Sequence, residues 1–194
     1  MTHLQRIIIL FFLLSLLSLI GAWAATYFST LRHDLLPAEK SYFPWRATAN
    51  AGANDGPAAT VDLRESTHTL VADFLLPAAA TYPYATLGVT LDENKFGTPL
   101  MDWSHYSAMV LNIKCQPANT LTFSLYTQES GISRLSDIES FRPAQSFFNC
   151  THEWSKVRIT FSNLATPVWW LERFQLGIAS QAYQLDKVRA FAIV

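Results

Sequence analysis

The sequence predicts an all-β protein, an antiparallel two-sheet β-sandwich preceded by one apolar N-terminal helix. Three observations lead to this fold class. An uncharged run of 22 residues stands near the N-terminus, apolar residues then recur with a period of two, and joints rich in Pro, Gly and Asn separate the alternating segments. Because half of the residues are hydrophobic and only 15% are charged, the chain is not intrinsically disordered.

The apolar run extends from Ile7 to Phe28, and as a helix it is long enough to cross the hydrocarbon core of a bilayer. Ala22-Trp23-Ala24 has the A-x-A pattern of a signal peptidase site, which favours cleavage. The aromatic residues Trp23, Tyr27 and Phe28 suit an uncleaved helix that ends at the membrane interface. We expect residues 1–28 to be a signal anchor, with a cleaved signal peptide as the alternative.

Both alternatives place the remaining chain outside the cytoplasm. We expect a membrane-anchored, extracytoplasmic domain, periplasmic if the host is bacterial, and a secreted domain if the segment is cleaved. Residues 29–57 are predicted to form a juxtamembrane linker, because Ala47–Pro57 is small, polar and turn-forming. The globular domain is therefore expected to occupy residues 58–194.

Within that domain, clean alternation of apolar and polar residues marks three antiparallel strands, at Met109–Cys115, Leu121–Tyr126 and Lys156–Phe161. Weaker patterns predict further strands at Thr60–Glu65, Thr69–Leu75, Ala85–Leu91, Phe174–Ala179 and Leu185–Ile193. About eight short strands at this spacing favour a sandwich, with a jelly roll as the arrangement we expect.

The sequence has two cysteines, Cys115 and Cys150, and each stands at the end of a predicted strand. In an oxidising compartment they are candidates for a disulfide. The alternative is two buried free thiols, since cysteine packs well as a small apolar residue.

Composition and motifs exclude several functions. A net charge of −1 gives no electrostatic reason to expect nucleic acid. The hydrolase, zinc protease, nucleotide and C-x-x-C redox motifs are absent, so we expect no enzyme activity, no metal site and no cofactor. A structural calcium ion, bound by loop carboxylates such as Asp92, Asp137 and Glu139, is the one exception left open.

The six tryptophans are the strongest functional feature, and four lie near strand ends or in connections: Trp103, Trp154, Trp169 and Trp170. Such residues either cap the core of a sandwich or form a platform on which a sugar ring stacks. We take all four as candidate ligand-binding residues. If the chain around Trp169 and Trp170 is extended, one of these two must point outward.

Several segments resemble the galactose-binding-like jelly roll. They are Tyr106–Lys114, Leu121–Tyr126, the Trp-x-x-Val-x-Ile-x-Phe strand at Trp154–Phe161, Pro167–Trp170 and Leu185–Val188. The domain is similar in particular to carbohydrate-binding modules and to the complex I intermediate-associated protein family, over about residues 60–194. This resemblance implies the fold more strongly than the function. Related modules also occur in bacterial sensor proteins, but this sequence has neither their second membrane span nor their output domain.

The preferred hypothesis is a membrane-tethered, non-catalytic module that binds or senses a carbohydrate or other small ligand. The second is a structural or assembly partner of another envelope protein. The third is a glycan-active enzyme, which requires two carboxylates in one groove. Neither the ligand nor the oligomeric state follows from the sequence.

Overall fold

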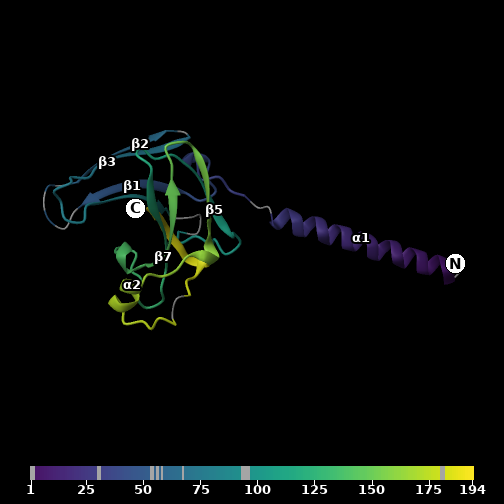
Figure 1. Cartoon of the computed structure of the whole chain (residues 1–194). Coiled ribbons are helices and arrows are strands. Elements are labelled where there is room, and N and C mark those ends of the chain that lie inside the picture. Colours follow the sequence, from purple (N-terminus) through teal and green to yellow (C-terminus); the bar gives the residue numbers. More distant parts are fainter. Residues whose placement is uncertain are drawn as a thin grey trace. The chain divides into compact units, whose positions relative to one another are not determined.

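The computed structural model describes residues 3–29, 32–52, 55, 57, 59–66, 68–92, 97–179 and 182–194. The chain divides into two compact units, Met1–His33 and Asp34–Val194. The first unit contains the helix α1 (His3–Ser29), and its stretch Ile8–Thr26 has a mean hydropathy of 2.5 (Figure 1). This stretch is long and apolar enough to cross a membrane, a property that uncleaved anchors and signal sequences share.

The second unit is built on one five-stranded sheet in which every neighbouring pair is antiparallel. The strand order places the last strand of the chain at the centre and the first at an edge. In spatial order the strands are β1 (Trp45–Gly52), β4 (Tyr84–Leu91), β9 (Val188–Ile193), β6 (Asn119–Thr127) and β7 (Arg142–Cys150).

Two strand pairs complete the sandwich: β2 (Thr60–Ser66) with β3 (Thr69–Leu75), and β5 (Ala108–Ile113) with β8 (Ser155–Thr160). Phe123, Leu125 and Phe191 of the large sheet share one buried core with Met109 and Ile159 of the β5–β8 pair. The β2–β3 hairpin packs beside β1 (Figure 1). The predicted all-β sandwich is therefore confirmed.

Short helices lie in the connections. The α-helix α2 spans Val168–Arg173, and four 3₁₀ turns span Ala38–Lys40 (η1), Ile138–Ser140 (η2), Phe161–Asn163 (η3) and Leu185–Lys187 (η4). Leu171 on α2 is fully buried, which attaches this helix to the domain. The predicted strand at Phe174–Ala179 is wrong, because this segment follows α2 as turns and irregular chain.

The predicted linker over residues 29–57 is also wrong in its second half, where Trp45–Gly52 forms the edge strand β1. Its alternation is hidden by small residues: Trp45 and Ala47 face the core, whereas Arg46 and Thr48 point outward. The Trp45 indole N–H also donates a hydrogen bond to the carbonyl oxygen of Leu35, over 2.7 Å. The folded domain thus begins well before residue 58.

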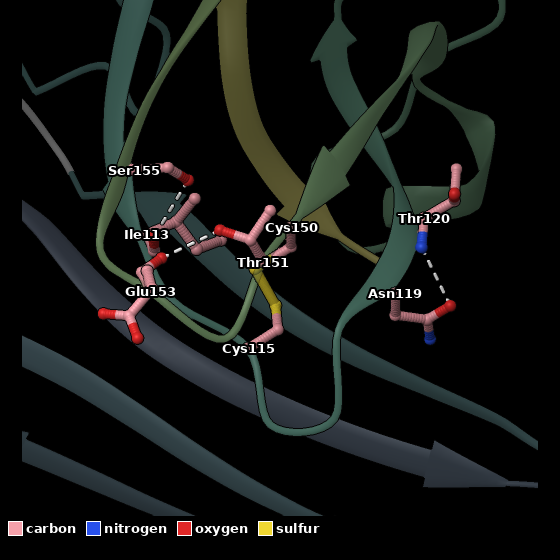
Figure 2. The surroundings of a disulfide bond; sticks show 8 residues. All are labelled: Ile113, Cys115, Asn119, Thr120, Cys150, Thr151, Glu153 and Ser155. Carbon is pink, nitrogen blue, oxygen red and sulfur yellow. Dashed lines mark hydrogen bonds between the residues drawn. A yellow bond between two sulfur atoms is a disulfide. The ribbon is translucent and has the colours of Figure 1, made fainter.

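The disulfide between Cys115 and Cys150 is formed, with an S–S distance of 1.98 Å and a Cα–Cα distance of 5.5 Å. It joins the segment after β5 to the end of β7, and so connects the two layers of the sandwich (Figure 2). The Cys115 amide also donates to the carbonyl oxygen of Thr151 over 2.8 Å. The disulfide prediction is confirmed.

Candidate ligand-binding face

Of the four tryptophans predicted to bind ligand, two are core residues. Trp103 is 3% exposed and stacks on Phe161 with ring centroids 6.0 Å apart. Trp170 is fully buried and covers the guanidinium of Arg142 at 4.9 Å. Neither ring presents a face to solvent, so the prediction is wrong for both. Both side chains lie in the core because a large aromatic ring beside a strand end buries the most apolar area there.

Trp154 and Trp169 are exposed, and their role stays a prediction. Trp154 lies in the connection between β7 and β8, and Trp169 lies on α2. We expected one of Trp169 and Trp170 to point outward, and Trp169 does, but on a helix rather than on an extended chain. No ring contact joins the two exposed tryptophans within the part of the chain that the structure describes.

The side of the large sheet that points away from the core has a different composition, which sequence reasoning missed. We call this side the open face. The strand register aligns its side chains in rows across the sheet. The rows are Gly52, Tyr84, Thr120 and Asn149; Asn50, Thr86, Val194, Thr122 and Phe147; Thr48, Gly88, Ala192, Ser124 and Gln145; and Arg46, Thr90, Ala190, Tyr126 and Pro143.

Neutral hydrogen-bonding groups dominate these rows, whereas the opposite side of the same strands is apolar core. Threonine, serine, asparagine and glutamine provide both donors and acceptors. Arg46 is the only charged residue in the four rows. The accessible part of this side lies toward its flanks: Thr48, Asn50, Thr120 and Asn149 are exposed, whereas Ser124, Pro143, Ala190 and Ala192 are buried.

The middle of the open face is lined by the shortest side chains. Gly88, Ala190 and Ala192 occupy its centre, while Thr48 and Phe147 on the flanking strands are exposed. A Cβ atom at Gly88 would lie only 2.8 Å from Oγ1 of Thr48. Glycine at this position of β4 therefore leaves room for the Thr48 hydroxyl above it. Ala190 and Ala192 are each 4% exposed, so the centre of the face offers little accessible surface.

Two exposed aromatic rings lie on the face, on strands to either side of this buried centre. Phe147 on β7 is 75% exposed, and Tyr84 on β4 is 50% exposed. Three strand spacings separate β7 from β4, which is about 14 Å across the sheet. The Tyr84 hydroxyl lies directly over Gly52, where a Cβ atom would approach it to 2.7 Å. The signal that could have located this face is the outward set Thr122, Ser124 and Tyr126 in the strand that alternation predicted most clearly.

Hydrogen bonds hold several of these polar groups in place. Gln145 Nε2 donates to Ser124 Oγ over 2.9 Å, and Thr120 Oγ1 donates to Asn149 Oδ1 over 3.0 Å. Burial raises the pKa of the Tyr126 phenol, a hydrogen bond with Ser124 opposes this shift, and the carboxylate of Glu139 adds to it. The phenol therefore stays protonated and able to donate a hydrogen bond at neutral pH.

A hollow of about 420 Å³ lies at the end of the open face, where β1 begins and β4 ends. It is lined by Arg46, Asp92, Pro99, Leu135 and Arg189. Leu135 comes from the connection between β6 and β7, so this connection borders the face at that end. Among the described residues, no three His, Cys, Asp or Glu side chains gather as a metal site would require, and structural calcium stays an untested prediction.

Comparison with known proteins gives structural similarity alone. No family model and no curated protein matches the chain. The structure is similar to the family 11 carbohydrate-binding module from Clostridium thermocellum in complex with a β-1,3-1,4-mixed-linked tetrasaccharide, at 14% identity and a TM-score of 0.49, over 81% of this chain and 82% of that one. It is also similar to the family 11 module of a cellulosomal cellulase from the same organism, at 13% identity and a TM-score of 0.45, over 84% and 92% of the two chains. Both of these structures are carbohydrate-binding modules, and the complex I intermediate-associated family finds no match.

Proposed function

We propose that this protein is a membrane-tethered, non-catalytic module that binds a carbohydrate chain on the open face of its extracytoplasmic domain. The observation that carries the proposal is the composition of that face. Sugars present hydroxyl groups, which need donors and acceptors, and C–H surfaces, which need aromatic rings. The open face supplies neutral polar side chains along its length and the rings of Tyr84 and Phe147 at its borders.

The shape of the face favours an extended chain over a single small molecule. The face crosses five strands, and the two strands that carry its exposed rings lie about 14 Å apart, so the rings would contact different sugar units of one ligand. The four rows contain no Asp or Glu, and glycoside cleavage requires a pair of carboxylates. This supports binding rather than catalysis. The helix α1 would serve as the tether.

Replacing Phe147 with alanine is expected to raise the Kd for a bound oligosaccharide about three- to tenfold, because one stacking interaction of roughly 0.5–1.5 kcal/mol is lost. Tyr84→Ala is expected to have a similar effect. A glycan array identifies the oligosaccharide, and calorimetry on the full chain measures Kd. The chain is kept in lauryldimethylamine oxide, since a detergent with a sugar headgroup would compete for the site.

Trp154→Ala and Trp169→Ala provide matched controls, because they remove exposed aromatic rings that lie outside the four rows. Because they lie off the proposed face, both are expected to leave Kd unchanged, which would overturn the ligand-binding role that the sequence predicted for these two tryptophans. If these two variants lose binding while Phe147→Ala retains it, the ligand site lies on the connections and the proposed face is wrong.

A further inference from the structure

The charge of the open face is confined to one end. Arg46 is the only charged residue of the four rows, and it borders the hollow together with Asp92 and Arg189. Among the described residues, two guanidinium groups therefore share this site with one carboxylate. The remaining lining, Pro99 and Leu135, is apolar.

The backbone fixes the position of Arg189. Its Nη1 group donates to the carbonyl oxygen of Leu91, at the end of β4, and to that of Pro99 over 3.4 Å. Within the described residues, no hydrogen bond occupies its Nε or Nη2 group. This arginine is half-buried without a carboxylate bonded to it, although carboxylates are the usual partners of buried guanidinium groups.

Arg46 is held less firmly. Its Nη1 atom lies 3.1 Å from Oδ1 of Asp92, and no second contact with that carboxylate is seen in the described part of the chain. The pKa of Arg189 is lowered mainly by burial and further by the positive charge of Arg46, whereas the carboxylate of Asp92 opposes this shift and so offsets part of the repulsion between the two cations. An anion placed between them would remove this repulsion and use the nitrogen atoms that Asp92 leaves vacant.

We infer that the hollow lined by Arg46 and Arg189 binds the carboxylate of an acidic sugar unit, so that the preferred ligand is a uronic-acid-containing chain lying along the open face. This inference rests on the proposed function. A carboxylate presents two coplanar oxygens, which match the fork of a guanidinium group. Leu135 and Pro99 form an apolar wall that suits the C–H surface of the same ring.

Two oligosaccharides with one backbone test the inference: cellohexaose, which is neutral, and the hexamer of β-1,4-linked glucuronic acid. Calorimetry on the full chain in lauryldimethylamine oxide is expected to show about fivefold tighter binding of the acidic hexamer at low ionic strength, with the difference shrinking at high salt. Arg46→Gln is expected to abolish the difference, because it weakens binding of the acidic hexamer several-fold more than binding of cellohexaose. Asp92→Asn is expected to strengthen binding of the acidic hexamer about two- to threefold, since a competing carboxylate is removed.

The outcomes distinguish failure of the carboxylate-site inference from failure of the proposed function. If cellohexaose binds and the acidic hexamer binds no better, the inference is overturned and the proposed function stands. If neither binds and the glycan array is silent, both fail. If Arg46→Gln weakens both ligands equally, or Asp92→Asn weakens the acidic one, the hollow is not a carboxylate site. Arg189→Lys, which keeps the charge but loses the fork, is expected to lose part of the preference for the acidic hexamer.

Discussion

Replacing both Cys115 and Cys150 with alanine is expected to lower the free energy of unfolding of the domain by about 3–4 kcal/mol. The disulfide closes a loop with a sequence separation of 35 residues, and in the chain-entropy model such a cross-link restricts the unfolded chain by that amount. A domain of this size is stable by only about 5–15 kcal/mol in total, so the loss is a large fraction of its stability. Loss of the buried Cys150 sulfur adds to the effect in the same direction.

Urea unfolding of the full chain, followed by tryptophan fluorescence, measures this change. The buried residues Trp103 and Trp170 report on the core. A reducing agent is the matched control: it should shift the midpoint of the native protein toward that of the double variant and leave the variant unchanged. A double variant with the midpoint of the oxidised native protein would contradict the prediction.

Replacing Glu129 with glutamine is expected to destabilise the domain by about 3 kcal/mol, because it removes the carboxylate that pairs with the buried guanidinium of Arg142. Arg142 is 3% exposed, and its Nε group donates to the Glu129 carboxylate over 2.7 Å. The same guanidinium lies under Trp170. The ion pair therefore connects β7 to the segment after β6, and the contact between Arg142 and the Trp170 ring connects β7 to α2.

Glu139→Gln is the control for this prediction, because the Glu139–Arg173 pair is of comparable length, 3.0 Å, but solvent-exposed. Its loss is expected to cost less than about 1 kcal/mol. The double variant Glu129→Leu with Arg142→Met is expected to recover most of the stability, since it removes both charges together. Equal effects of Glu129→Gln and Glu139→Gln in urea unfolding would show that burial of Arg142 does not matter.

Alternation predicted the strands whose two sides differ most in polarity. Met109–Cys115, Leu121–Tyr126 and Lys156–Phe161 correspond to β5, β6 and β8 within a residue or two. It failed where one side of a strand is made of small residues, as in β1, and where both sides are covered. In β7 the first three residues are all buried, and Pro143 breaks the expected pattern at an edge strand, where proline is tolerated.

The candidate site was harder to predict than the fold. Trp103 and Trp170 were predicted to bind ligand because of their residue type. A ring can contact a ligand only if it is exposed, and the exposure of a side chain depends on tertiary packing. No sequence motif marks the open face, because its rows combine residues from five strands that are distant in sequence, from Thr48 to Ala192. Each strand shows only that its outward residues are neutral and polar. The register that brings them together follows from the sheet topology.

The central position of β9 sets the order in which the sheet can assemble. β1 pairs only with β4, and β7 pairs with β6, so both hairpin-like halves can form on their own. They are joined only when Val188–Ile193 inserts between β4 and β6. This step closes contacts across about a hundred residues of chain, which makes it entropically costly and slow. Until it occurs, the facing edges of β4 and β6 are open to pairing with other chains, so the polypeptide is most prone to aggregate just before its last strand is in place.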